Sequence, residues 1–579
     1  MKFPTVFRWR INQKYFQIGI YLITLLHLVE IRRDLDHKHI FITSDGQIKY
    51  YQTLQMAEGE FRNSECLYPG LELDPEYKYY LFDYPWAFFH SNGLKCAFQY
   101  SPYFPWIGSI FYRYLGEKFV TFTPLLFWFL SILVFERVLH SLGVRFWISL
   151  LVAISLFWGG FLSLSALDYA EFTLNDFLAL VGIWGYVRFF SSVQSVHNSN
   201  QKLVSWKEIF YLIAAILGLF SSILLRPEGM VGIGIFLGLG IFFFWNQIVA
   251  LFSNFRFWMV SIVSFSLLVG FYLLVNTLYS QNPLGFRISN TGKDLQTLYD
   301  LSRIWSGWIA DLWKSDFKTG LFFAFPALFL FPLLLLFPIQ FHKDALSLDS
   351  IQKKFGYQFL GSGFMSCLLI PLLSPYRAGY HHFGNRYFEV AVVLFFLGIA
   401  ILWNQVLNFP KSLKSFPNRY KAFKIFSIFL VVSYFLFSYM SLRYTKEGWK
   451  VLKQSASLYS QLQDLLNEIG RASDSQQKIP IVHKSLFTNY LVGVSFLDRA
   501  QFLTVSKNEM QKLEEIFQEA GIREYLVLEY MGTPRYMSDI PKKLYEEKIN
   551  VRYESPKDRF LDGEKKDFLE FQIKRRIRK

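Results

Sequence analysis

Long runs of apolar residues constrain this chain more than any other feature. Spanning a bilayer takes roughly 20 apolar residues, and about eleven stretches approach that length with few internal charges. They lie at 16–31, 119–139, 144–163, 171–190, 207–225, 229–249, 256–276, 319–338, 356–374, 387–406 and 423–441. With 52% hydrophobic and 18% charged residues, the chain is too apolar for a soluble multidomain protein. We therefore expect an all-α polytopic membrane protein with about eleven transmembrane helices.

Basic residues predict the orientation of these helices. The chain has 60 Lys and Arg against 45 Asp and Glu, a formal net charge of +15. Counted from a basic N-terminus with a retained signal anchor, every second connection is short and rich in Lys and Arg, which predicts that these connections face the cytoplasm. Much of the excess charge then sets the topology, and nucleic acid is not an expected partner. The expected location is the plasma (inner) membrane, with the N-terminus cytoplasmic.

The first exterior segment, 32–118, is too long for a simple hairpin loop. Near its end, apolar side chains recur at three- and four-residue spacing, with small and polar residues opposite. The apolar ones are Trp106, Ile107, Ile110, Phe111, Tyr114 and Leu115. This pattern predicts an amphipathic helix at about 104–116 in the membrane interface, or else a lead-in to the second span. Cys66 and Cys96 lie in the same segment, and an oxidising compartment would allow them to form a disulfide.

The chain changes character after residue 442, so we expect two domains, 1–442 and 443–579. A helical stretch at 447–469 and a polar linker precede three strand-like segments at 479–482, 501–505 and 524–529. Ser506 and Glu509 predict a capping box that opens a helix between the last two strands. Strand, helix and strand at this spacing indicate a small extracytoplasmic α/β domain with parallel strand pairing.

Unusual polar residues concentrate on the predicted exterior side. Asp45 and Gly46 follow the first span; an Asp-Gly pair alone is typical of a turn. An acid at the start of a span, such as Glu171, also stabilises the helix dipole. Arg226 and Glu228 could simply pair across the turn between the fifth and sixth spans. The further exterior candidates are Lys49, Tyr50, Asp83 and Asp168.

The densest polar cluster lies at 374–387, at the mouth of the tenth span. It holds Arg377, His381, His382 and Arg386. Guanidinium groups suit phosphate oxygens, although a loop that merely keeps its charges in water is the alternative. Adjacent His residues point apart, and no third ligand is suitably spaced, so a metal site is not expected. The sequence contains no nucleotide-binding motif in a suitable context.

Five features, in this order, resemble the GT-C superfamily of membrane glycosyltransferases, which includes dolichyl-phosphate-mannose mannosyltransferases and lipid A aminoarabinose transferases. The features are Asp45-Gly46 with Tyr50-Tyr51; Tyr100-Ser101-Pro102-Tyr103-Phe104-Pro105 with the amphipathic segment; Gly218-Leu219 running into Leu225-Arg226-Pro227-Glu228-Gly229; Asn282-Pro283-Leu284-Gly285; and Phe383-Gly384-Asn385-Arg386-Tyr387. Many members have two adjacent acids in the first loop, whereas Gly46 follows Asp45 here.

The resemblance implies an inverting transfer of a sugar from a polyprenyl-phosphate donor to a lipid, glycan or protein acceptor. Asp45 would be the general base. Arg226, Arg377, His382 and Arg386 would stabilise the donor phosphate. Lys49, Tyr50, Asp83, Asp168 and Glu171 are candidates for contacts with the sugar or acceptor. No cofactor is expected.

Three other classes of protein remain open at this point. A secondary transporter would have internal repeats and ionisable residues near the span centres, whereas the charges here lie at span ends. A polysaccharide ligase or polymerase would centre its chemistry on a large late exterior loop. A membrane scaffold would use the C-terminal domain to bind a partner.

Overall fold

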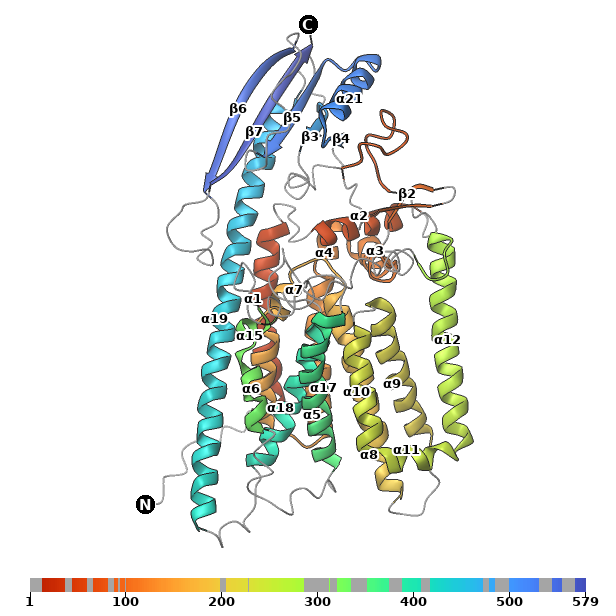
Figure 1. The fold of residues 1–579 in the computed structure, drawn as a ribbon, viewed down its shortest axis with the longest axis vertical. Helices are drawn as coiled ribbons and strands as arrows, with labels where there is room; N and C mark the ends of the chain where they lie inside the picture. The colour runs from red at the N-terminus through yellow and green to blue at the C-terminus, as the bar shows by residue number, and fades with distance from the viewer. Residues whose placement is uncertain are drawn as a thin grey trace.

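The computed structural model shows a helical membrane bundle that carries a layer of short helices and a C-terminal sheet at one end (Figure 1). Its termini and several connections lie outside the residues described below. The described residues are 13–36, 44–59, 66–81, 88–91, 94–98, 100–197, 205–226, 229–285, 312, 320–334, 351–373, 388–407, 417–471, 478–484, 499–530, 544–554 and 568–578.

Eight described helices are long and apolar enough to cross a membrane, or nine spans if one bent helix pair counts as one. The chain is therefore a multi-pass membrane protein, and its expected fold class is confirmed. The eight are α1 (Gln13–Asp36), α5 (Thr123–Ser141) together with α4 (Glu117–Val120), α8 (Phe172–His197), α9 (Trp206–Leu225), α12 (Phe255–Ser280), α17 (Ile351–Leu373), α18 (Glu389–Leu407) and α19 (Pro417–Ile469).

Three expected spans differ from single straight helices. The stretch 229–249 forms α10 (Gly229–Phe243) and α11 (Trp245–Phe252), bent by 86°. The stretch 144–163 forms the shorter α6 (Phe146–Phe157), followed by α7 (Leu162–Ser165). In 319–338 the structure has α15 (Leu321–Ala324) and the 3₁₀ helix η2 (Pro326–Leu330). Proline lacks the N–H that would continue a helix, which explains the break at Pro326.

The two broken segments meet, and α19 satisfies their backbone groups. Gly160 has a positive φ of 63°, and a Cβ there would lie 2.3 Å from the ring of Phe325. Thr445 Oγ1 donates to the Gly160 carbonyl at 2.9 Å, and Ser441 Oγ donates to the Ala324 carbonyl at 2.6 Å. Irregular backbone is tolerated inside a membrane where neighbouring side chains supply these hydrogen bonds.

Glycines allow the central helices to approach closely. A Cβ at Gly218 on α9 would lie 2.3 Å from the backbone nitrogen of Gly182 on α8, and one at Gly363 on α17 would lie 2.5 Å from that of Phe395 on α18. Small residues at helix contacts are typical of membrane bundles, where close packing drives association. These contacts hold together the helices that carry the polar residues of the candidate site.

Above the bundle lie α2 (Ser44–Glu58), α3 (Tyr103–Leu115) and a hairpin of β1 (Phe88–Ser91) and β2 (Leu94–Phe98). α3 matches the expected amphipathic helix. Its small face packs inward, because Gly108 meets the Tyr169 hydroxyl and Thr53. Its apolar residues Trp106 and Ile110 are exposed. A helix with this division can lie in the interface with its apolar face toward lipid.

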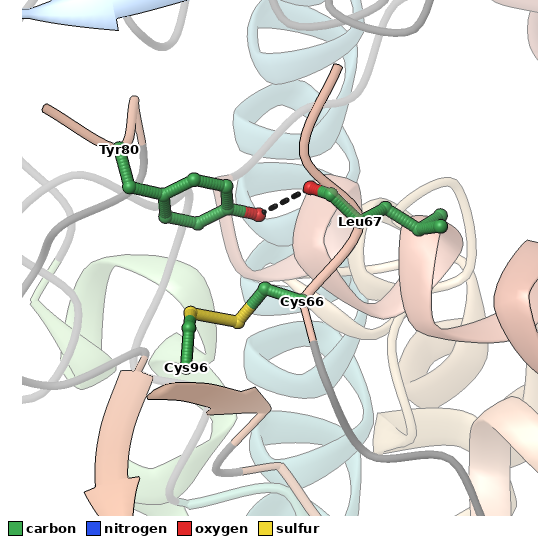
Figure 2. Close-up of a disulfide and its surroundings, with 4 residues drawn as sticks. All are labelled: Cys66, Leu67, Tyr80 and Cys96. Carbon is green, nitrogen blue, oxygen red and sulfur yellow. Dashed lines mark hydrogen bonds between the residues drawn. A yellow bond between two sulfur atoms is a disulfide. The ribbon is translucent and has the colours of Figure 1, made fainter. Parts of the chain in front are cut away.

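Cys66 and Cys96 form a disulfide, which confirms the expected pair (Figure 2). The bond closes a loop with a sequence separation of 30. Beside it, the Tyr80 hydroxyl donates to the Leu67 carbonyl at 2.9 Å. The disulfide thus braces the layer formed by α2, α3 and the β1–β2 hairpin.

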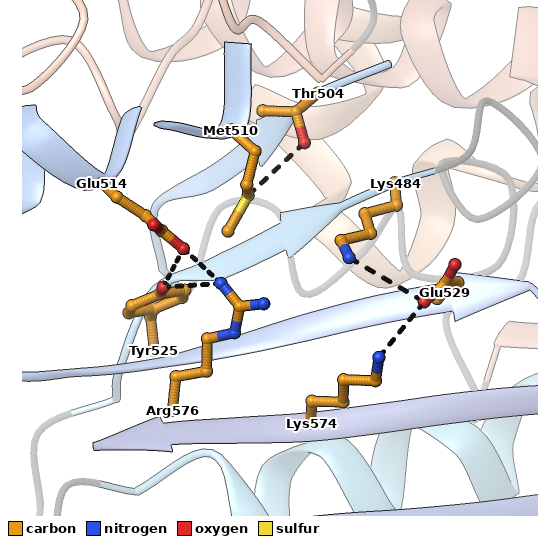
Figure 3. Close-up of polar contacts among 8 residues, drawn as sticks. All are labelled: Lys484, Thr504, Met510, Glu514, Tyr525, Glu529, Lys574 and Arg576. Atoms are coloured by element: carbon orange, nitrogen blue, oxygen red, sulfur yellow. Dashed lines mark hydrogen bonds and ion pairs between the residues drawn. The ribbon is translucent and has the colours of Figure 1, made fainter. Parts of the chain in front are cut away.

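The C-terminal sheet contains β3 (Ile481–His483), β4 (Gln501–Leu503), β5 (Glu524–Tyr530), β6 (Leu544–Glu554) and β7 (Phe568–Arg578) in the order β4-β3-β5-β7-β6. β3 pairs in parallel with both β4 and β5, as expected, whereas β6 and β7 add antiparallel strands that the sequence reading missed. α21 (Lys507–Glu519) begins with the expected capping box. Arg576 pairs with Glu514 and fastens this helix to the sheet (Figure 3).

Contacts with two parts of the chain join the sheet to the rest of the molecule. The backbone N–H of Leu503 donates to the Tyr79 carbonyl at 2.8 Å, so the segment around Tyr79 extends the edge at β4. Arg499 donates to the carbonyls of Leu466 and Gly470 at the end of α19. The sheet and α2 consequently lie at the same end of the bundle (Figure 1). The proposed domain boundary at 442 falls within the unbroken α19 and stays a prediction.

Candidate functional site

A buried ion-pair network lies where α2 meets the bundle. Lys49 comes from α2, Glu171 directly precedes α8, and Arg226 caps the C-terminus of α9. Glu171 Oε2 pairs with Lys49 Nζ, and Glu171 Oε1 lies 3.5 Å from Arg226 Nη1. The three side chains are 3 to 6% exposed. One carboxylate thus bridges two buried cations that come from distant parts of the sequence.

The helix end explains where Arg226 points. The sequence continues with Pro227, which cannot extend a helix. Arg226 accordingly leaves the helical conformation, with φ −139° and ψ 98°. Its side chain then reaches Glu171 instead of following the helix into the bundle.

Aromatic rings frame both cations. The Arg226 guanidinium carbon lies 4.3 Å from the centroid of the Phe172 ring, and Lys49 Nζ lies 5.6 Å from the same centroid. Lys49 Nζ also lies 4.7 Å from the centroid of the Tyr100 ring. Ring faces attract cations within about 6 Å, most strongly where water is excluded. The Phe172 ring, next to Glu171 in sequence, therefore contacts both cations.

More acids than the sequence reading singled out surround this network. Asp176, one turn into α8, is buried and interacts electrostatically with Glu389 and Arg226. Among the described residues, Asp176 Oδ1 has no hydrogen-bond partner. Glu389 opens α18 and accepts a hydrogen bond from Ser165 Oγ at 2.6 Å. Charged residues inside apolar spans are rare and usually functional, and that rule could have flagged both acids.

Apart from Tyr50, the remaining expected residues are Asp45, Asp168 and four that lie outside the described part of the chain. Asp45 is the second residue of α2, one helical turn before Lys49, and nothing further is described of its side chain. Asp168 is buried near the network. Its neighbour Leu167 accepts a hydrogen bond from the buried guanidinium of Arg32 at 2.7 Å. Four expected residues lie outside the described part of the chain: Asp83, Arg377, His382 and Arg386.

Tyr50, next to Lys49 in sequence, makes a separate contact. Its hydroxyl donates to Glu117 Oε1 at 2.7 Å. Burial, together with the Glu117 carboxylate, raises the pKa of Tyr50 well above its usual value. The phenol therefore stays protonated at neutral pH and is a hydrogen-bond donor rather than a base.

Two other features of the described residues bear on the kind of site. No group of three or more His, Cys, Asp or Glu among them could hold a metal ion. An apolar cavity of about 530 Å³ lies between α8, α9, α10, α11 and α12. Its lining is apolar except for Ser261 and the Tyr186 hydroxyl, so it offers no acid, base or cation. The cavity is therefore separate in character from the charged Glu171 network.

No protein-family model matches the chain, and no curated protein matches it in sequence. Solved structures similar to it include the archaeal oligosaccharyltransferase AglB from Archaeoglobus fulgidus, in complex with an inhibitory peptide and a dolichol-phosphate. That structure is 12% identical, has a TM-score of 0.47, and the match covers 89% of this chain and 70% of AglB. An apo form from the same organism has 12% identity, the same coverage and a TM-score of 0.46.

ArnT from Cupriavidus metallidurans, in the apo state, is 13% identical with a TM-score of 0.34; the match covers 89% of this chain and 93% of ArnT. At these identities and TM-scores, the likenesses give no information on donor, acceptor or residue roles. Both AglB and ArnT are membrane glycosyltransferases of the GT-C superfamily, which is the superfamily that the sequence motifs resemble.

Proposed function

We propose that this chain is a membrane glycosyltransferase that moves a sugar from a polyprenyl-phosphate donor to an acceptor hydroxyl on the extracytoplasmic face. The observation that carries the proposal is the pair of buried cations, Lys49 and Arg226, which share one carboxylate, with Lys49 one helical turn after Asp45 on α2. A lipid-linked phosphate reaches such a site from the membrane, and charge-assisted contacts with guanidinium and ammonium groups are strong where water is excluded.

The proposed reaction is a single displacement. Asp45 accepts the proton of the acceptor hydroxyl, whose oxygen attacks the anomeric carbon of the sugar. The bond between that carbon and the phosphate oxygen breaks, and its electron pair leaves with the lipid phosphate. Lys49 and Arg226 stabilise the charge that develops there. Attack from the face opposite the leaving group inverts the anomeric centre.

Arg377, His382 and Arg386 remain proposed contributors to donor phosphate binding. Asp83 and Asp168 remain proposed contacts for sugar or acceptor, as does the protonated hydroxyl of Tyr50. We place Lys49 and Glu171 differently from the sequence-based expectation, with the phosphate rather than with the sugar, because Glu171 ties Lys49 directly to Arg226.

The first experiment measures binding of the part that all such donors share. Purified protein is titrated with a short-chain polyprenyl phosphate, with the matching polyprenol as the uncharged control, and bound lipid is counted by native mass spectrometry. Hydrogen bonds to charged groups contribute roughly 1.5 to 3 kcal/mol, so Lys49→Met and Arg226→Met should each weaken binding of the phosphate by about 10- to 100-fold. Equal binding of phosphate and polyprenol would contradict the proposal.

The second experiment tests the base. Asp45→Asn should lower release of lipid phosphate from polyprenyl-phosphate sugars by about 10²- to 10⁴-fold, the usual contribution of a general base, with membrane insertion unchanged. Asp464→Asn, at an exposed position on α19, is the matched control and should keep wild-type activity. Full activity of Asp45→Asn would show that another group takes the proton.

A further inference from the structure

Glu171 makes the contacts that a bound phosphate would need. Its two carboxylate oxygens are divided between the cations, Oε2 on Lys49 Nζ and Oε1 on Arg226 Nη1. The adjacent residue, Phe172, places its ring against both cations. Two non-bridging oxygens of a phosphate group could form the same fork. We propose that Glu171 is a built-in competitor of the donor phosphate, so that carboxylate and phosphate occupy Lys49 and Arg226 in alternation.

This inference rests on the proposed function and adds a regulatory role within the same site. Burying two like charges without a counterion is costly, since an unpaired buried charge can cost several kcal/mol. Glu171 neutralises the cations when no donor is present. When one anion replaces the other, the two buried cations are never left without a counterion.

The charge balance of the described residues favours exchange over addition. Lys49 and Arg226 already share the carboxylate of Glu171, and the buried Asp176 interacts electrostatically with Arg226 as well. A phosphate added beside Glu171 would raise the negative charge further and would be repelled. If Glu171 moves away from the cations as the phosphate arrives, the balance around Lys49 and Arg226 stays nearly constant.

The competition weakens donor and product binding alike, and it matters most for release of the product. A polyprenyl-phosphate sugar is a phosphodiester with one negative charge, whereas the released polyprenyl phosphate is a monoester with about −1.5 to −2 charge at pH 7. The product therefore binds the two cations more tightly than the donor does. A carboxylate that returns to the cations opposes this tighter binding, and Glu171 would thus speed release of the spent lipid.

The test is Glu171→Gln, which keeps the size of the side chain and removes its charge. We expect polyprenyl phosphate to bind at least ten times more tightly than in the wild type, measured by native mass spectrometry. With a sugar donor, KM and kcat should fall together, because binding improves and product release slows. Glu208→Gln is the control: Glu208 lies at the other end of α9 in a capping box that Gln can also complete, and neither value should change.

The outcomes separate this inference from the function on which it rests. If wild type and Glu171→Gln bind the phosphate equally, or if the variant binds more weakly, Glu171 is not a competitor, while the proposed function stands. If neither binds the phosphate in preference to the polyprenol, the proposed function fails. Should Glu171→Gln not fold, Glu171→Asp has a shorter reach to both cations and should show a smaller rise in affinity; unchanged or weaker binding there would overturn the inference.

Discussion

Two regions of the molecule place one glutamate between two basic side chains. In the membrane domain, Glu171 pairs with Lys49 and Arg226. In the C-terminal sheet, Glu529 pairs with Lys484 at 3.9 Å and Lys574 at 3.6 Å (Figure 3). The sheet cluster uses a single oxygen, Glu529 Oε2, for both lysines, whereas Glu171 gives one oxygen to each cation. Only the Glu171 cluster pairs each basic side chain with a separate oxygen, as a forked anion does.

The backbone around each cluster differs as well. Glu529 and Lys574 lie on the paired strands β5 and β7, and Lys484 directly follows β3, which pairs with β5. Ladder hydrogen bonds therefore fix all three positions. Glu171 directly precedes α8 and Arg226 ends α9, so each is joined to regular secondary structure on one side only. The same charges can thus stabilise a sheet in one place and exchange a ligand in another.

The largest expected effect on stability comes from removing the disulfide. This change should destabilise the region near α2 and leave the C-terminal sheet intact. Closing a loop of about 30 residues stabilises a fold by roughly 3 to 4 kcal/mol in the chain-entropy model. The double variant Cys66→Ser with Cys96→Ser should lower the unfolding temperature of the layer that contains α2, α3 and the β1–β2 hairpin. It should also weaken polyprenyl phosphate binding. Hydrogen exchange in β5 and β7 should stay unchanged. Identical gel mobility of reduced and oxidised wild-type protein would contradict the disulfide itself.

A slightly smaller effect should follow from lowering the pH, and it should fall on the sheet alone. Burial lowers the pKa of His483 to about 4, although its hydrogen bond with Gln501 opposes the shift. In the unfolded chain the pKa is about 6.5. Between these values the unfolded state binds a proton that the folded state does not, so stability is full above pH 6.5 and falls by about 3 kcal/mol as the pH approaches 4.

Urea denaturation of the sheet at several pH values checks this, and His483→Gln should flatten the dependence. A pH profile that is equally steep in His483→Gln would assign the loss to another group.

The smallest expected effect on stability comes from Glu529→Gln, which is directly comparable with Glu171→Gln. Glu529→Gln removes the charge of the sheet cluster, whose Glu529 side chain is 15% exposed. Partly solvated pairs at these distances contribute about 1 kcal/mol or less. We expect a small loss of sheet stability and unchanged polyprenyl phosphate affinity, in contrast to Glu171→Gln. A tenfold change in lipid affinity from Glu529→Gln would place the sheet cluster in the binding site.

Some features of the molecule follow from local sequence and others do not. Long apolar runs located the spans, and the spacing of Ser506 and Glu509 located α21. Both features depend on residues that are neighbours in sequence. The break at Gly160 depends on Phe325, more than 150 positions away. Similarly, Glu171 joins Lys49 to Arg226 across the chain. A single sequence contains the residues of such contacts but not their distances, so Glu171 was expected only as a sugar contact or a helix-dipole partner.

α19 has a mechanical consequence for the whole molecule. Its 53 residues form one unbroken helix, about 80 Å long at 1.5 Å per residue. The apolar part, Lys424–Lys450, takes about 40 Å of this length. The C-terminal part, 451–469, extends roughly 28 Å beyond it, and Arg499 bonds the sheet to its tip. A change of about 10° in the tilt of the span, as bilayer thickness varies, would swing that tip by roughly 5 Å. Because α19 is one continuous helix, the position of the sheet should change with the thickness of the membrane.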